Sequence, residues 1–292
     1  MNEKILNKIS LVLICYNSSS KLKKFLKNIP KQTKVFLIDN SKDYSLKKLF
    51  SNQKNIKIFY KKNDGYGASI NYAVKKIKTE YFFVVQPDVK GINKNSLITF
   101  YNYAKKLNNK FSVIGPHFRK APKKGHFQTN LKYDIKKIHN VHGSTIFFNR
   151  KVFIKNRGFD PKIFLYWEET DYTKRALKYG FSAYQLNKVK VIHEKGKAVG
   201  VKNNQEEQKL THLYSWHFIW SKFYFFKKHY GRVFALTYFL PILFRILFRI
   251  MYYRFTKNKK FLKYYYRWDG ALNSILEKKS HMRLENIKLN IL

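Results

Sequence analysis

The first two-thirds of this chain alternates short apolar runs with amphipathic runs, and this alternation constrains the fold more than any other feature. Strands buried on both faces are almost continuously apolar, and strands that alternate with helices form a mostly parallel sheet covered by helices. The runs that we expect to be strands are 9–16, 34–41, 56–60, 81–85, 112–116, 144–148 and 183–193. The pattern therefore predicts an α/β fold.

The sequence changes character near residue 200. Residues 202–231 predict a long helix with an aromatic face, 234–253 are almost entirely apolar, and the remaining residues are basic and mixed. We therefore expect two parts: an α/β domain over 1–201 and a helical, aromatic and basic extension over 202–292.

Three further segments of the α/β part are informative. Residues 63–77 combine a glycine-bearing turn with a helical pattern, and the polar side chains of 17–20 should cap a helix over 21–28. Residues 118–140 are basic and lack apolar periodicity, and a loop of this length inside a compact domain is usually functional. We expect this loop to shape a ligand pocket.

The chain carries a large positive charge. It has 60 Lys and Arg against 17 Asp and Glu, a formal charge of +43, which attracts nucleic acids, anionic lipids or phosphorylated substrates alike. A second interpretation is solvated surface lysine, because abundant Lys, Asn, Ile, Tyr and Phe together are typical of an A/T-biased genome. Cys15 is the single cysteine, which excludes a disulfide framework. The charged start lacks a signal-peptide core, so we expect a cytoplasmic protein.

Polar residues follow three of the predicted parallel strands. Tyr16 and Asn17 end the first, Asp39 and Asn40 the second, and Asp88 follows the fourth. Ligands of open α/β sheets bind outside the carboxyl ends of the strands. Each residue taken alone has another explanation, since Asp39 suits a turn and Tyr16 a core. Together they predict a nucleotide site.

The motifs that surround these residues resemble those of the family 2 inverting glycosyltransferases, which have the GT-A fold, in particular the rhamnosyltransferase-like subset. The resemblance covers roughly residues 9–230. In chain order the matching motifs are CYNS, IDNS, NDGYGASIN, QPDV, HGS, GFDPKIFLYWEETDYTKRALKYGF, VIHEKG and FFKKHYG. It implies a GT-A catalytic domain that moves a sugar from a nucleoside diphosphate donor, dTDP-rhamnose being one candidate. The implied acceptor is a hydroxyl of a cell-surface glycan or of a polyprenyl-diphosphate-linked saccharide.

The resemblance also implies a donor-binding set. Tyr16 or Asn17 would contact the nucleobase, and Asp39 would accept a bond from the imide N–H of a uracil or thymine. The positions that match the stretch near the nucleotide sugar are Asn63, Gly65, Gly67 and Asn71.

A divalent metal is implied at the end of the fourth strand. Asp88 matches the last acid of the family's metal-binding D-x-D, and Gln86 replaces the first acid. His193 matches a late histidine that completes the metal site in some relatives, although an isolated histidine is often structural. Mg²⁺ or Mn²⁺ would neutralise the departing diphosphate, and phosphates and water would fill the remaining positions.

Three acids lie within four residues at Glu168, Glu169 and Asp171, a rare cluster in so basic a chain. Inversion at an anomeric carbon needs one carboxylate to take the proton of the attacking hydroxyl. The family pattern E-D-x-D is E-E-T-D here, so the resemblance assigns the catalytic base to Glu169. Acids at a helix start also complement the macrodipole, a role that we assign to Glu168 or Asp171.

Two neighbours of the acids are candidates for substrate binding. Arg175 matches a family position and lies four residues after Asp171, so we expect an i,i+4 ion pair first and a diphosphate or acceptor contact second. Trp167, with Tyr166 before it, would form an apolar wall against a sugar ring or belong to a core.

The apolar segment 234–253 is interrupted by Pro241, Arg245 and Arg249. Central arginines are costly in a spanning helix, so we expect a helix lying in the membrane interface with its arginines on headgroups, followed by basic residues. The following lysines are Lys257, Lys259, Lys260 and Lys263. A buried helix or an oligomer contact is the alternative. The prediction is peripheral attachment to an anionic membrane surface, on the inner face of the cell membrane.

Two other classes compete with a glycosyltransferase. The basic excess and the aromatics of 214–226 would suit a nucleic-acid-binding protein, but the sequence has no helix-turn-helix, RNP or zinc signature, and acids at the strand ends would repel phosphates. We therefore disfavour nucleic acid as a partner. A catalytically inactive relative that serves as a scaffold is the third class, because Gln86 and Glu169 depart from the family pattern.

Overall fold

The computed structural model describes residues 2–119, 132–194, 198–201 and 203–290. The chain forms two compact units, one of Met1–Asp160 with Glu169–Gly200 and one of Pro161–Glu168 with Val201–Leu292. The second unit thus starts beside the expected boundary at 201/202, and it also takes the short segment before the acidic cluster. Most of the predicted loop 118–140 lies outside the described residues.

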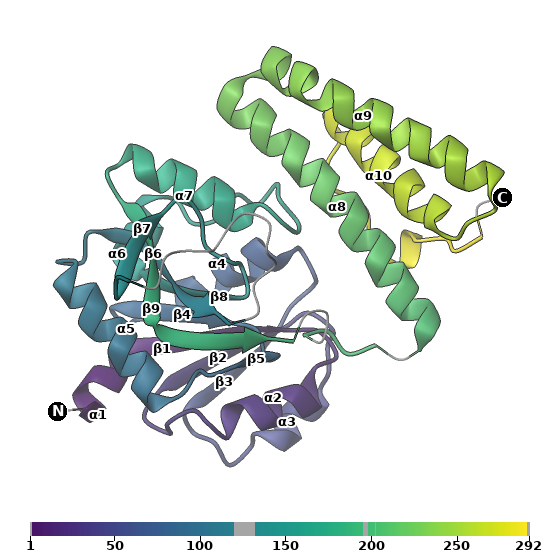
Figure 1. Ribbon diagram of the computed structural model, residues 1–292. Helices are drawn as coiled ribbons and strands as arrows, with labels where there is room; N and C mark the ends of the chain where they lie inside the picture. Colours follow the sequence, from purple (N-terminus) through teal and green to yellow (C-terminus); the bar gives the residue numbers. More distant parts are fainter. Residues whose placement is uncertain (1, 120–131, 195–197, 202, 291–292) are drawn as a thin grey trace. The chain divides into compact units, whose positions relative to one another are not determined.

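The first unit is an α/β domain (Figure 1). Its strands are β1 (Ile9–Cys15), β2 (Lys34–Asp39), β3 (Ile56–Tyr60), β4 (Tyr81–Val85), β5 (Val89–Lys90), β6 (Phe111–Phe118), β7 (Ile135–Ile138), β8 (Thr145–Asn149) and β9 (Ser182–His193). Its helices are α1 (Asn2–Leu6), α2 (Ser19–Leu26), α3 (Ser45–Leu49), α4 (Tyr66–Lys76), α5 (Lys94–Lys106), α6 (Arg150–Lys155) and α7 (Glu168–Lys178).

The strands of the described residues form one mixed sheet in the order β3-β2-β1-β4-β8-β6-β9-β5, with β7 beside β9. β1 is parallel to β2 and β4, β2 is parallel to β3, and β6 is parallel to β9. β8 is antiparallel to both β4 and β6. The carboxyl ends of β1, β2 and β4 therefore meet at one edge of the sheet, as the sequence predicts.

Alternate side chains of each central strand enter two separate cores. On β4, Tyr81 and Phe83 join a core built with α2, α3 and α5, whereas Phe82 and Val84 join one built with α4, α6 and α7. Because successive side chains of a strand point to opposite faces, a strand buried on both sides is continuously apolar. The helices cover both faces of the sheet (Figure 1).

The apolar runs predict most strands well, and the differences have local causes. β7 lies inside the segment that we expected to be a loop. Its sequence Ile-Lys-Lys-Ile is half exposed and too polar to give the apolar run by which the other strands were predicted. Ser18 begins α2 without a side-chain capping bond from any described residue, contrary to the expected cap. The antiparallel insertion of β8 makes the sheet mixed.

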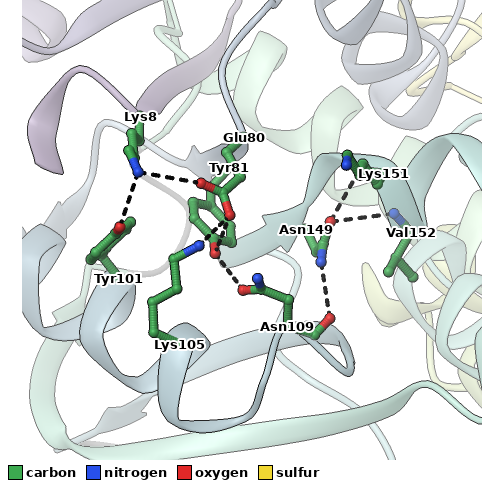
Figure 2. Close-up of polar contacts among 9 residues, drawn as sticks. All are labelled: Lys8, Glu80, Tyr81, Tyr101, Lys105, Asn109, Asn149, Lys151 and Val152. Atoms are coloured by element: carbon green, nitrogen blue, oxygen red, sulfur yellow. Dashed lines mark hydrogen bonds and ion pairs between the residues drawn. The ribbon is translucent and has the colours of Figure 1, made fainter.

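A polar cluster fastens the amino-terminal end of β4 (Figure 2). The Glu80 carboxylate pairs with Lys105 and lies 4.0 Å from Lys8 Nζ. The Tyr81 hydroxyl lies between Glu80, at 2.9 Å, and the side-chain oxygen of Asn109. Every carboxylate and hydroxyl in this cluster has a partner, which is the arrangement expected of buried polar groups that serve structure.

The second unit consists of α8 (Asn204–Tyr230), α9 (Arg232–Phe255), α10 (Lys260–Ile275) and a 3₁₀ turn, η1 (Leu284–Asn286). Gly270 of α10 lies against α8, where a Cβ would be 2.6 Å from the Trp216 carbonyl oxygen. The Trp216 indole donates to Asp269 Oδ2 at 2.6 Å. The close approach and this bond fix α10 against α8.

Candidate active site

Asp39 organises the loops that follow β1 and β2. It is fully buried; Oδ1 accepts a bond from Ser41 Oγ and Oδ2 from the Asp43 N–H, both at 2.6 Å. Ser41 Oγ also accepts a bond from the Asn17 N–H at 3.0 Å, where Asn17 has a left-handed backbone with φ of 50°. The structure gives Asp39 a supporting role in these turns, and its bond to a nucleobase stays a prediction.

The loop after β1 is covered by residues 199–200. The Gly200 N–H donates to the Tyr16 carbonyl at 3.1 Å, and Lys21 Nζ donates to the Val199 carbonyl at 3.1 Å. A Cβ on Gly200 would lie 1.7 Å from the Asn17 carbonyl oxygen, so only glycine permits this approach. Tyr16 and Asn17, the predicted nucleobase contacts, are both partly exposed beside this segment.

The glycine-bearing turn leads into α4 at the same edge. Gly65 has φ of 109°, a conformation that other residues rarely adopt, and its N–H donates to Asn63 Oδ1 at 3.3 Å. Ser69 Oγ donates to the Gly65 carbonyl and also accepts a bond from the Asn40 amide. The turn of Asn63, Gly65 and the buried Gly67 is thereby tied to the loop after β2.

Two predicted binding residues fasten the backbone of 156–159 instead. The Asn71 amide donates to the Phe159 carbonyl and its oxygen accepts the Phe159 N–H, both at 2.9 Å. The Arg175 guanidinium donates to the carbonyls of Asn156 and Gly158 and pairs with the Asp171 carboxylate at 2.8 Å. The expected i,i+4 ion pair is therefore present. Both side chains hold the backbone of 156–159 in place, and their contacts with substrate stay predictions.

The end of β4 carries a buried carboxylate whose oxygens are not hydrogen-bonded. Only 1% of the Asp88 side chain is exposed, and neither oxygen has a hydrogen-bond partner among the described residues. His193 Nε2 lies 3.3 Å from Asp88 Oδ2, and the other ring nitrogen, Nδ1, also lacks a partner in the described part of the chain. A buried carboxylate without a donor is costly unless a cation compensates it.

These residues fit a divalent cation. Among the described residues there is no group of three or more His, Cys, Asp and Glu side chains that could hold a metal, and Gln86 replaces a second acid. Mg²⁺ and Mn²⁺ accept carboxylate, imidazole, phosphate and water ligands. Asp88 and His193 would be the protein ligands, and phosphate oxygens and water would complete the shell.

The segment 142–144 connects this carboxylate with the acidic cluster. The His142 ring lies edge to face with the His193 ring, their centroids 5.1 Å apart. The Tyr66 hydroxyl donates to the Gly143 carbonyl at 2.8 Å. On the other side, a Cβ added to Gly143 would lie 3.5 Å from Glu169 Oε2. A continuous series of contacts thus leads from Asp88 to Glu169.

Glu169 has the properties of a base that works near neutral pH. It keeps a small exposed surface, but protein atoms surround most of the side chain. Burial raises its pKa from an ordinary value of 4.5 to about 7, a shift opposed by a backbone hydrogen bond. Such a carboxylate accepts a proton readily at pH 7 or above.

The other two acids of the cluster lie in different surroundings. Asp171 is fully buried and forms an ion pair with Arg175, which gives it a structural contact, and its roles toward the helix macrodipole and in catalysis stay predictions. Glu168 is the first residue of α7 and is 3% exposed. Glu169 lies against the 142–144 segment, where a Cβ on Gly143 would be 3.5 Å from its Oε2.

Trp167 belongs to the helical unit. Its ring packs on Phe225 of α8 with centroids 5.0 Å apart, while Tyr166 contacts Phe218 at 5.7 Å. Both residues have left-handed backbones, with φ of 71° and 67°, which is rare and strained for aromatic residues. The structure supports the core alternative for Trp167, and its contact with a sugar stays a prediction.

Sequence reasoning did not assign a role to His142, Gly143 or Tyr66. Their contacts join positions 142 with 193, 143 with 169 and 66 with 143. The signal was available in the HGS motif and in the tyrosine of NDGYG, but nothing in their local sequence shows that they meet.

Comparisons with known proteins identify the family and the fold. Residues 10–157, slightly more than half of the chain, match the family described as Glycosyl transferase family 2. The chain therefore belongs to this family and is a glycosyltransferase with a GT-A-like α/β fold and a C-terminal helical extension.

The chain is also similar to individual members of known function. It is 22% identical over 215 residues to the low-salt glycan biosynthesis hexosyltransferase Agl10 of Haloferax volcanii, a match that covers 66% of this chain and 69% of that protein. It resembles the mannosyltransferase PcManGT of Pyrobaculum calidifontis, solved with GDP-Man and Mn²⁺, with a TM-score of 0.56, 13% identity and coverage of 93% and 88%.

TarS of S. aureus provides a second structural comparison. Its residues 1–349, solved with UDP-GlcNAc, give a TM-score of 0.53 at 14% identity, covering 93% of this chain and 92% of that one. Against a longer TarS structure the match covers 71% of this chain and 39% of that one, with a TM-score of 0.52 at 17% identity. At these identities the likeness shows the shared fold.

Proposed function

We propose that the protein transfers a hexose or deoxyhexose from a nucleoside diphosphate sugar to a hydroxyl of a glycan acceptor, with inversion at the anomeric carbon. The observation that carries the proposal is the buried Asp88 carboxylate, which lies beside His193 and accepts no hydrogen bond from the residues that the structure describes. The contacts through 142–144 connect Asp88 with Glu169, a carboxylate of raised pKa, and this supports a role for both residues in one site.

Glu169 is the proposed base. As the acceptor oxygen bonds to C1 of the donor sugar, Glu169 takes the hydroxyl proton, and the bond between C1 and the diphosphate oxygen breaks with its electron pair leaving on the diphosphate. A Mg²⁺ or Mn²⁺ ion held by Asp88 and His193 would neutralise the charge of that diphosphate. Gly143 places its backbone against the Glu169 carboxylate, which limits solvent around the base.

The donor side is assigned to the loops after β1 and β2 and to the turn before α4. Tyr16 and Asn17 are the proposed nucleobase contacts. The turn of Asn63, Gly65 and Gly67 presents the amino-terminal end of α4, where backbone N–H groups suit phosphates. Asp39 is the proposed acceptor of the imide N–H of a uracil or thymine, and Asn71 and Arg175 are proposed to contact the donor or acceptor in addition to the backbone segments that they hold.

The identity of the sugar is the finer part of the proposal. The sequence resemblance favours dTDP-rhamnose, Agl10 is named a hexosyltransferase, and the two structural relatives were solved with GDP-Man and UDP-GlcNAc. The name of Agl10 also supports a glycan as acceptor. These donors define the panel to be tested.

The test is a donor turnover assay with UDP-glucose, UDP-GlcNAc, GDP-mannose and dTDP-rhamnose, each with Mn²⁺, Mg²⁺ or chelator. We expect one donor to release its nucleoside diphosphate only when a divalent cation is present, and not in the presence of chelator. Thermal stabilisation by the matching nucleotide reports binding separately. Stabilisation without any turnover would favour the inactive scaffold, and stabilisation by oligonucleotides alone would favour a nucleic-acid-binding protein.

A variant separates binding from chemistry. Glu169→Gln should keep its stabilisation by the nucleotide and lose turnover by roughly 10²–10⁴-fold, the usual contribution of a general base. Glu80→Gln is the matched control, because Glu80 lies at the end of β4 opposite to Asp88. This variant should turn over the donor normally. A Glu169→Gln protein with unchanged turnover would overturn the assignment of the base.

A further inference from the structure

Helix α9 exposes a continuous apolar face. Its members recur every three, four or seven residues, so they lie on one side of the helix. The most exposed are Phe255 at 90%, Val233 at 77%, Met251 at 70% and Phe248 at 69%. We define the outer face of α9 as Val233, Leu240, Phe244, Phe248, Met251 and Phe255. A contiguous apolar face of this kind marks an interaction surface.

The opposite face of α9 is already packed within its own unit. Ala235, Phe239 and Ile246 are buried in a core shared with α8 and α10. Arg249 donates to the Tyr264 hydroxyl of α10, and its guanidinium lies 5.1 Å from the centre of that ring. The structure thus corrects one expectation, because Arg249 is bound to α10 instead of being directed to headgroups. Arg245 remains exposed.

The segment that contains α9 carries formal charges of one sign. Between Glu207 and Asp269 the chain has thirteen Lys and Arg and no Asp or Glu. Arg245 and Arg254 are exposed on α9 itself, and three exposed lysines follow its carboxyl-terminal end. These lysines are Lys257, Lys259 and Lys260.

We propose that the outer face of α9 binds an anionic lipid bilayer, with the helix lying in the plane of the interface. Apolar side chains would enter the boundary between headgroups and acyl chains, and the surrounding cations would contact anionic headgroups. A second copy of the chain is a poorer occupant, because a symmetric contact would bring two acid-free, cationic faces together.

The same features favour a helix that lies on the membrane over one that crosses it. Among the described residues α9 is the one helix that is long and apolar enough to span a bilayer, with a mean hydropathy of 1.8. A spanning α9 would have to leave the core that holds Phe239 and Ile246 and break the contact of Arg249 with Tyr264. An interfacial helix keeps both.

Vesicle flotation of the full chain, without donor, tests the proposal independently of the proposed function. The protein should float with phosphatidylcholine vesicles that contain phosphatidylglycerol and remain unbound with phosphatidylcholine alone. The triple variant Phe244→Ser, Phe248→Ser, Met251→Ser should lose at least tenfold in partitioning. The matched control changes three exposed apolar residues elsewhere, Ile154→Ser, Tyr179→Ser and Leu276→Ser, and should bind like the parent chain.

A second variant tests the electrostatic part. Changing Lys257, Lys259 and Lys260 to Gln should weaken binding about fivefold for each lysine, as expected for cations near an anionic surface. Binding of the parent chain should fall steeply with salt. Circular dichroism and thermal melting of each variant check that it is folded. Partitioning that neither variant changes would overturn the proposal.

A depth probe distinguishes the occupants of the face. Cys15 is buried, and burial raises the pKa of its thiol, so a surface cysteine can be labelled selectively. A polarity-sensitive dye on Phe248→Cys should shift to shorter wavelength with anionic vesicles and be quenched by shallow lipid quenchers, whereas a dye on Leu276→Cys should not respond. Quenching only at the bilayer centre would indicate a spanning helix. A concentration-dependent shift without vesicles would indicate self-association, and either result would overturn the proposal.

Discussion

Each end of β4 carries one acidic side chain, and the two differ in their hydrogen bonding. At the amino-terminal end, Glu80 is bound by Lys105 and Tyr81, and its neighbours are bound in turn (Figure 2). At the carboxyl end, Asp88 is buried, and neither of its oxygens has a hydrogen-bond partner among the described residues. The strand between them is equally buried throughout.

The pKa values of the acids on this domain make the same contrast. Burial pushes the pKa of Glu80 upward, but the hydrogen bonds from Lys105 and Tyr81 and the charges of Lys105 and Lys8 together outweigh it and leave the pKa below its ordinary value. For Glu169 burial is the main cause, opposed only by a backbone hydrogen bond, and its pKa rises to about 7. The satisfied end stabilises the fold, and the unsatisfied end is suited to a ligand and to proton transfer.

Of the acids at the two ends of β4, Asp88 should give the larger effect. Asp88→Asn should lower donor turnover about a thousandfold. The variant lacks the negative charge that would hold the metal, and a bound metal would stabilise the charge on the departing diphosphate by several kcal/mol. The melting temperature should stay the same or rise, since a buried charge without donors is removed. Turnover and thermal unfolding of the same preparation check both. A variant that retains turnover, or that melts much earlier, would make Asp88 a structural residue like Glu80.

The pH dependence of turnover should follow Glu169. Below pH 7 the carboxyl group is protonated and cannot accept a proton, so kcat/KM should fall about tenfold per pH unit and level off above pH 7. Because the pKa of Glu169 is higher in the folded protein than its ordinary value, ionisation of this group lowers the free energy of unfolding. The protein therefore loses this part of its stability as pH rises from 4.5 to 7. Glu169→Gln should melt above the parent at pH 8 and together with it at pH 4.

Removing the satisfied acid should affect stability alone. Glu80→Gln should cost about 1 kcal/mol, because its lysine partners are partly exposed and solvent screens them, which is a loss of roughly 2–4 °C. The lowered pKa makes this stabilisation present above 4.5 and lost as pH falls through the folded value. If Glu80→Gln impaired turnover at an unchanged melting temperature, the contrast between the two ends would fail.

The smallest effect is expected at Gly143. Gly143→Ala would add a methyl group 3.5 Å from Glu169 Oε2, an ordinary contact distance, so the domain should still fold. Less room for solvent around the carboxylate should raise its pKa further and move the pH midpoint upward by less than one unit. The pH profiles of the two proteins, measured side by side, test this. An unchanged midpoint would show that the backbone there does not control the base.

The fold could be predicted because its main signal is local. The runs at 56–60 and 81–85 coincide with β3 and β4. β4 is buried on both faces and therefore apolar without interruption, whereas β3 at the end of the sheet is partly exposed and still shows a short apolar run. The antiparallel direction of β8 is set by its pairing with β4 and β6, which a pattern within 144–148 does not contain.

The candidate site was predictable in residue type and less so in role. Asn71 and Arg175 have the side chains of substrate contacts, yet their partners are backbone atoms of 156–159. Asn71 is 88 positions from Phe159, and Tyr66 is 77 positions from Gly143. Distances of this kind along the chain are closed by the fold, so a motif shows which chemistry is present without showing which partner uses it.

The absence of acids between Glu207 and Asp269 has a consequence for control of the molecule. Burial lowers the pKa values of His212 and His217 on α8, the latter to about 3, so His217 stays neutral under mildly acidic conditions. The charge of the segment comes mainly from thirteen Lys and Arg, so its attraction to an anionic surface is set chiefly by salt. Acidity and ionic strength would thus act as independent controls, the first on sugar transfer and the second on attachment to a surface.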